Sequence, residues 1–132
     1  MRTPITSFVV VLPIVIAACG GTGTTAPSAT GPTPITWTTA IGSGGIASRS
    51  FTTTAAGAVN VTLQAAPLPL GIGLGVPRAA GNGCHLAVST TAVAGASPQL
   101  TTPVDGGNYC VEVFDVGGIS DPISFTLQVS YP

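Results

Sequence analysis

The closing stretch decides the fold, because apolar and polar residues alternate through Ile123-Ser124-Phe125-Thr126-Leu127-Gln128-Val129-Ser130-Tyr131. A period of two places all the large apolar side chains on one face of an extended strand. The same alternation recurs in residues 58–64, 70–76, 86–88 and 108–115, and more weakly near 37–41, 49–53 and 99–104. No window has the 3.6-residue period of an amphipathic helix. We therefore predict an all-β chain of seven or eight short strands that pack as a two-sheet sandwich.

Charged residues are scarce in this chain. Its 132 residues include three Arg, no Lys and four acidic residues, so that 5% of the chain is charged, whereas about 25% is usual. Without a basic patch, nucleic acid is excluded as a partner. Thr, Gly and Pro take the place of the charges. Thr favours strands, and Gly and Pro favour turns, which agrees with the β prediction.

The N-terminus has the features of an export signal. Arg2 is followed by an apolar run over residues 4–16, which is shorter than the 20 or so residues of a membrane-spanning helix. The next residues, Ile16-Ala17-Ala18-Cys19, resemble the lipobox of bacterial lipoproteins. This resemblance implies cleavage before Cys19, a diacylglyceryl group on its thiol and, because Gly20 follows, delivery to the outer membrane. The alternative is an ordinary signal peptide with an incidental Cys.

Three segments follow from these patterns. Residues 1–18 are the expected lipoprotein signal peptide, and residues 19–34 the lipidated Cys with a flexible tether. The tether is expected because residues 20–34 have no charge, no aromatic residue and no aliphatic side chain larger than Ala, so they cannot offset their ordering entropy. Residues 35–132 form the expected β-sandwich domain. The partner predicted first is thus a membrane, bound through the N-terminal lipid, with the domain facing the periplasm or the cell surface.

From Phe51 to Tyr131 the chain resembles the bacterial pre-peptidase C-terminal domain. The similar stretches are residues 51–63, the Gly-x-Tyr-x-Val-x-Val turn and strand that begin at Gly107, and residues 125–129. The resemblance implies a small jelly-roll-like antiparallel β-sandwich. It also implies an accessory role beside exported enzymes, although no peptidase precedes the domain in this sequence.

Cys84 and Cys110 remain once Cys19 is assigned to the lipid. An oxidising compartment favours a disulfide between them, and this bond would close a loop of 27 residues, worth about 3.5 kcal/mol by chain entropy. Two free thiols or a metal site are the alternatives, but adjacent His85 is the only imidazole and does not complete a zinc tetrahedron.

The two cysteines pose a problem of orientation. If Leu86 and Val88 point into the core, Cys84 points inward as well, whereas Cys110 alternates with inward-facing residues and points outward. Because a disulfide needs both sulfurs on one side, we expect a bulge or an irregular strand start near Gly83.

The residues that could support catalysis or metal binding form no complete set. His85 lacks a G-x-S-x-G nucleophile turn, and Glu112 and Asp115 lie three apart on one strand, on opposite faces, so they do not pair as glycosidase carboxylates. Some pre-peptidase C-terminal domains bind calcium, so the resemblance makes candidates of three acids, although no loop has dense D-x-D spacing: Asp105, Asp115 and Asp121. We expect no metal and no cofactor.

Two further features could belong either to packing or to binding. Gly71-Ile72-Gly73-Leu74-Gly75 is not a dinucleotide loop and indicates a strand with one bare face, which a neighbouring segment packs against or a ligand approaches. Trp37 could stack on a carbohydrate from an exposed Thr-rich face, or belong to the core.

We therefore expect a non-enzymatic, lipid-anchored binding or structural module of the cell envelope, with an envelope protein or a glycan as possible partner. Two alternatives stay open. One is an accessory domain that assists secretion or assembly of another exported protein. The other is a small hydrolase that uses His85.

Overall fold

Eight strands make up the domain in the computed structural model, which describes residues 33–132. They are β1 (Thr33–Ile41), β2 (Ile46–Thr53), β3 (Gly57–Ala65), β4 (Leu70–Pro77), β5 (Cys84–Ala92), β6 (Leu100–Val104), β7 (Gly107–Phe114) and β8 (Ile123–Tyr131). All eight expected strands are present, so the all-β prediction is confirmed. The first strand starts two residues before the expected boundary at 35, because Thr33 and Pro34 pair with β8. The signal peptide, Cys19 and the rest of the tether lie outside the described residues.

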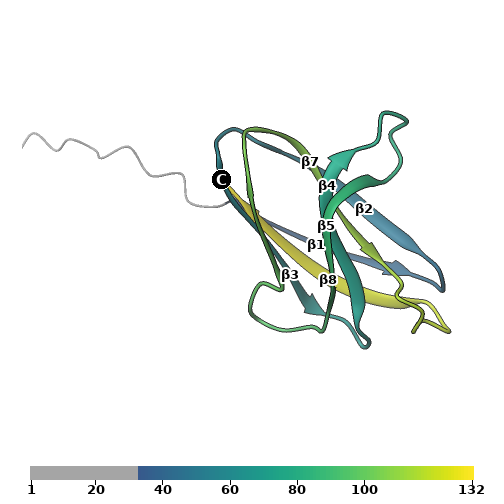
Figure 1. The fold of residues 1–132 in the computed structure, drawn as a ribbon. Helices are drawn as coiled ribbons and strands as arrows, with labels where there is room; N and C mark the ends of the chain where they lie inside the picture. Colours follow the sequence, from purple (N-terminus) through teal and green to yellow (C-terminus); the bar gives the residue numbers. More distant parts are fainter. Residues whose placement is uncertain (1–32) are drawn as a thin grey trace, which may run out of the picture.

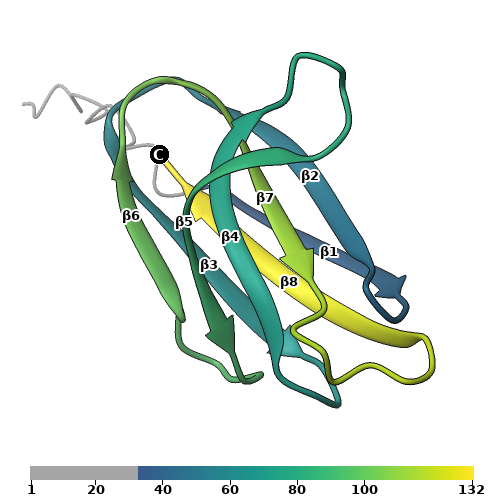
Figure 2. The ribbon, with the colours of Figure 1, turned by 45° about the vertical axis from the view of Figure 1, so that its right-hand side comes forward.

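The strands form two antiparallel sheets with the orders β1-β8-β3-β6 and β2-β7-β4-β5. Figures 1 and 2 show the sheets as two layers, with the chain crossing from one to the other after nearly every strand. Within residues 33–132, only β4 and β5 are both consecutive and hydrogen-bonded to each other. Eight strands in this order form a jelly roll. The β4–β5 hairpin is therefore the one connection that stays within a single sheet and can extend from it.

The core lies between the two inner faces, where the alternating positions meet as predicted. From β8, Phe125, Leu127 and Val129 are at most 2% exposed. Other strands and the β7–β8 loop complete the cluster: Ile41, Phe51, Val59, Val61, Leu63, Leu70, Ile72, Leu74, Ala92, Leu100, Val111, Val113 and Ile119. Because each strand gives only every second side chain to this core, the other half of each strand forms an outer face.

The turn between β6 and β7 explains the Gly-x-Tyr pattern. The Tyr109 hydroxyl donates to the Asp105 carbonyl, four residues upstream, at 2.9 Å. The Thr53 hydroxyl donates to the same carbonyl at 2.9 Å and accepts the Gly107 N–H at 3.1 Å. Tyr109 thus holds the start of β7 against the preceding turn by a hydrogen bond. This contact gives the Gly-x-Tyr motif a structural explanation.

Arg49 is a charged residue on the inner face of β2, an edge strand. It pairs with Val111, whose side chain is buried, yet Arg49 itself is exposed because β2 is the edge of its sheet. A charge that points inward at an edge discourages the addition of a further strand. Arg49 therefore lies on the opposite side of this sheet from the site described below.

Candidate functional site

Alternate glycines leave the outer face of β4 without side chains of its own. A Cβ built on Gly71 would lie 2.1 Å from the ring of Phe114, and one built on Gly73 would lie 2.7 Å from a methyl carbon of Leu86. Both distances are far below a van der Waals contact, so neighbouring side chains fill the glycine face. The packing interpretation of this glycine string is confirmed at these two positions.

A β-bulge in β5 resolves the orientation of the cysteines. The register between β4 and β5 shifts where Ala87 has no partner. One extra residue reverses the alternation, so that Leu86 lies on the outer face with Cys84, whereas Val88 packs against the core. The expected inward position of Leu86 is therefore wrong. The expected bulge exists, but lies further along β5 than the strand start near Gly83.

The predicted disulfide joins Cys84 of β5 to Cys110 of β7, with their Cα atoms 5.9 Å apart. Strand β4 lies between these two strands in the sheet, so the end of the β4–β5 hairpin must bend across the outer face to bring Cys84 to Cys110. Figures 1 and 2 show this hairpin projecting from the sheet close to β7 and β2. The disulfide therefore fixes the hairpin end over the outer face.

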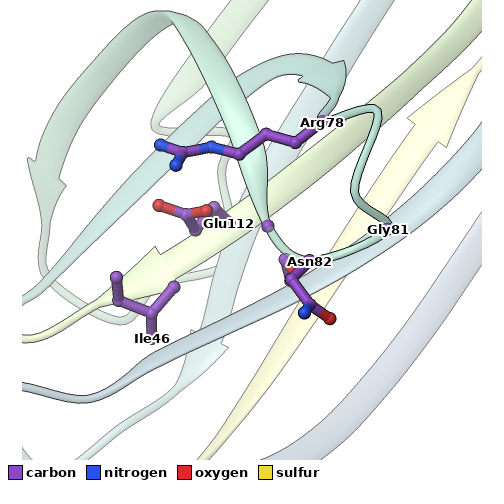
Figure 3. A pocket seen from close by; sticks show the side chains of 7 residues that line it. Ile46, Arg78, Gly81, Asn82 and Glu112 are labelled. Atoms are coloured by element: carbon purple, nitrogen blue, oxygen red, sulfur yellow. The ribbon is translucent and has the colours of Figure 1, made fainter.

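A pocket of about 570 Å³ lies between the hairpin end and the outer face. Figure 3 shows it from close by. We call it the hairpin pocket, and its lining residues come from β2, the hairpin loop and β7: Ile46, Ser48, Arg78, Gly81, Asn82, Gly83 and Glu112. Its volume falls within the range of small-molecule sites in proteins.

Glu112 is the buried acid of this pocket. Its side chain is 8% exposed, and one carboxylate oxygen, Oε2, accepts the Cys84 N–H at 3.1 Å. Within residues 33–132, no fully buried side-chain oxygen lacks a hydrogen-bond partner. The second oxygen, Oε1, accepts no hydrogen bond from the described residues, so it must be open to the pocket that Glu112 lines. The fold thus holds a carboxylate with one oxygen bound and one available.

Arg78 is the cation of the same pocket. Its Nε donates to the Cys84 carbonyl at 3.1 Å, which leaves the two terminal amino groups of the guanidinium uncommitted. Figure 3 shows the guanidinium above the carboxylate of Glu112. Among the described residues, no hydrogen bond or ion pair joins the two groups. Both charges are oriented by the backbone of one disulfide-bonded residue, and the pocket carries no net charge.

Asp115 has a structural role at the neighbouring loops. Its Oδ2 accepts the Gly44 N–H at 2.9 Å, and its Oδ1 accepts those of Gly117, Gly118 and Ile119 at 2.8, 3.0 and 3.3 Å. The Gly44 hydrogen bond in particular, with those of Gly117, Gly118 and Ile119, lowers the pKa of the Asp115 carboxyl, against a smaller opposing effect of desolvation. The carboxylate thus joins the β1–β2 turn to the β7–β8 loop.

The other proposed metal ligands are not brought together. Asp105 lies in the β6–β7 turn and Asp121 in the β7–β8 loop, both exposed. Within residues 33–132, no three His, Cys, Asp or Glu side chains converge as they would on a metal ion. The N–H groups around Asp115 already use both of its oxygens, so this candidate does not suit calcium.

His85 and Trp37 both lie outside the hairpin pocket. His85 is exposed on β5, where it pairs with Val76. Trp37 is half-buried against the core, with its ring edge-on to that of Phe125 at 5.4 Å between centroids. Trp37 therefore lies on the inner face of its sheet, against the core, and outside the hairpin pocket.

The sequence analysis missed Arg78 and its place beside Glu112 in one pocket. A signal was present, because Glu112 lies two residues after Cys110 on the same face of one strand, and Arg78 lies six residues before Cys84. A disulfide between these cysteines brings the two charged residues together. The hairpin's fold across the sheet was needed to see that they line one pocket.

Comparisons with known proteins support the fold alone. No family model matches the chain, and no curated protein matches it. A solved structure, the Yersinia pseudotuberculosis-derived mitogen, is similar with a TM-score of 0.52 and 13% sequence identity, over 76% of this chain and 87% of that one. Separately, the part of the chain described here has no helix of the length and hydrophobicity needed to span a membrane.

Proposed function

We propose that this chain is a non-enzymatic, lipid-anchored β-sandwich of the bacterial cell envelope that binds a ligand in the hairpin pocket. The observation that carries the proposal is Glu112, a carboxylate only 8% exposed whose free oxygen opens into a pocket that Arg78 also lines. The free oxygen, Oε1, is a charged hydrogen-bond acceptor, and such acceptors form stronger hydrogen bonds than neutral ones. A ligand that donates to this oxygen and accepts from Arg78 would contact both groups at once, so the arrangement favours binding.

The anchor is proposed from the sequence. Cys19 in the lipobox-like stretch would carry the diacylglyceryl group, and two acyl chains suffice for stable attachment to a membrane. The Cys84–Cys110 disulfide supports export, because such bonds persist in oxidising compartments. We propose the outer membrane as the destination, with the domain facing the periplasm or the cell surface.

The composition of the pocket favours binding over hydrolysis. A glycosidase needs two carboxylates on either side of the scissile bond, whereas the hairpin pocket has Glu112 as its acid, and Asp115 is engaged with loop N–H groups. A hydrolase that used His85 would need a site elsewhere, since His85 does not line this pocket. If such an activity is found, a His85→Ala variant with unchanged turnover removes that alternative.

Lipidation is tested by the intact mass of the protein extracted from membranes. Wild type should carry a diacylglyceryl mass on a chain that begins at Cys19, and Cys19→Ser should lack it; Cys84→Ser is the matched control and should keep it. A wild-type chain without added lipid mass would contradict the anchor.

A separate test addresses the accessory-domain alternative. Specific co-purification of one exported protein with the lipidated form would favour that alternative.

A further inference from the structure

The geometry points to a neutral saccharide with adjacent hydroxyl groups as the ligand of the hairpin pocket, an inference that rests on the function proposed above. Glu112 Oε1 can only accept hydrogen bonds, and the terminal nitrogens of Arg78 can only donate them. A hydroxyl does both, so two neighbouring hydroxyls can donate to Glu112 and accept from Arg78 at the same time. Both groups line the pocket, and Figure 3 shows the Arg78 guanidinium next to the Glu112 carboxylate.

The charges of the pocket select against ionic ligands. An anion would be attracted to Arg78 but repelled by Glu112, and a cation would meet the reverse. Outside the pocket, the domain carries one Arg and three Asp side chains, a net charge of −2 that disfavours an anion further. Salt screens these exposed charges over about 8–10 Å. A neutral ligand that hydrogen-bonds to both groups is repelled by neither charge. The hydrogen bonds would also be strong, because each includes a charged protein group.

The remaining lining residues suit the same ligand. Ile46 is 62% exposed beside the two charges, and offers an apolar surface to the C–H face of a sugar ring. Ser48 and Asn82 add a hydroxyl and an amide, which both donate and accept. The pocket of about 570 Å³ is partly open to solvent, so it could take one unit of a longer glycan.

The site is built into the fold. Backbone groups of Cys84 hold both functional side chains, since its N–H binds Glu112 and its carbonyl binds Arg78 Nε. The disulfide to Cys110 fixes Cys84 itself over the sheet. Preorganisation of this kind lowers the entropic cost of ligand binding.

Saturation-transfer NMR on the full-length protein in lipid nanodiscs tests the inference. The neutral probes are methyl α-D-mannopyranoside and methyl β-D-glucopyranoside, with glucuronate as anion, glucosamine as cation and alanyl-alanine as zwitterion; empty nanodiscs give the background. We expect saturable binding of at least one neutral probe, with both ionic sugars at least fivefold weaker.

Variants assign the binding to the pocket. Glu112→Gln and Arg78→Gln should each weaken the neutral probe about tenfold, because a charged hydrogen-bond partner becomes neutral. Arg49→Gln, which removes the same charge from the opposite side of the sheet, and Asp121→Asn should leave affinity unchanged. Asn82→Ala changes a pocket residue on the exposed loop and should weaken binding two- to fivefold. Because this exposed position should not disturb the fold, the variant tests the pocket even if the other two variants misfold.

The outcomes separate the inference from the function on which it rests. Binding of alanyl-alanine or of an ionic sugar with the same variant pattern, and no binding of neutral probes, overturns the saccharide inference but keeps the pocket as a binding site. Neutral binding that is unaffected by all three pocket variants overturns the inference by placing the saccharide elsewhere. No binding of any probe overturns the inference. Independently of this result, a wild-type chain without a lipid mass on Cys19 overturns the anchor.

Discussion

Replacing Gly75 by Ala tests how the β5 bulge and the glycine face of β4 hold the hairpin over the sheet. A Cβ on Gly75 would lie 1.8 Å from the carbonyl oxygen of His85, which is backbone and cannot rotate away. Overpacking in a well-packed region costs typically about 1–3 kcal/mol, and a backbone clash of this depth belongs at the upper end. We expect Gly75→Ala to destabilise the domain by about 3 kcal/mol or more.

Substitutions at two other glycines, one in β4 and one in a loop, should cost less. At Gly73 the new Cβ would meet the end of the flexible Leu86 side chain at 2.7 Å, which can move, so we expect about 1 kcal/mol. The control is Gly118→Ala in the β7–β8 loop, where a Cβ would meet nothing within 4 Å. That variant should be neutral or slightly stabilising, by less than about 1 kcal/mol, because Ala restricts the unfolded chain.

Urea denaturation of the oxidised protein, followed by tryptophan fluorescence, gives these differences from the shift in midpoint at constant slope. Trp37 packs on Phe125 in the core, so its emission reports loss of tertiary structure. The order expected is Gly75→Ala, then Gly73→Ala, then Gly118→Ala. A Gly75→Ala protein as stable as Gly118→Ala would refute the close backbone approach at the bulge.

Two more predictions concern stability. Cys84→Ala with Cys110→Ala should reduce the free energy of unfolding by about 3.5 kcal/mol, the chain entropy of the 27-residue loop, as measured by urea denaturation; a loss below about 1 kcal/mol would contradict the stabilising role of the bond. Asp115→Asn should lower the thermal midpoint at neutral pH, and its difference from wild type should shrink under acid. Hydrogen bonds lower the folded-state pKa of Asp115 below its usual 3.8, so its contribution is complete above pH 3.8 and is lost as the pH falls through that lower value. Asp121→Asn is the control, and a difference from wild type that grows below pH 3.8 would reverse the assigned sign.

The sequence predicted the strands well because each side chain's burial follows from a period of two. In β8 the alternation runs without interruption from Ile123 to Tyr131, and the structure buries the expected side. The predicted orientation of Leu86 was wrong for a local reason. The bulge at Ala87 moves the Leu86 side chain to the other face without changing the composition of β5. A bulge leaves no regular trace in a pattern of apolar residues.

The site was harder to predict than the fold. The disulfide partners were evident from the count of cysteines, but the pocket depends on where the hairpin end lies. Arg78 and Glu112 are 34 residues apart in the sequence, and they meet because β7 and the β4–β5 hairpin are joined across β4 by the disulfide. Trp37, the residue that composition alone made attractive, packs on Phe125 instead. Three-dimensional proximity, rather than residue type, distinguishes the candidate site.

We expect the hairpin pocket to be the binding surface of this domain. A crystal structure of the protein grown with the tightest-binding neutral saccharide probe tests it most directly. We expect sugar density within hydrogen-bond distance of Glu112 Oε1 and a terminal nitrogen of Arg78 (Figure 3). Sugar density elsewhere, for example on the Thr- and Gln-lined outer face of β1 and β8, with the hairpin pocket free of sugar, would contradict it.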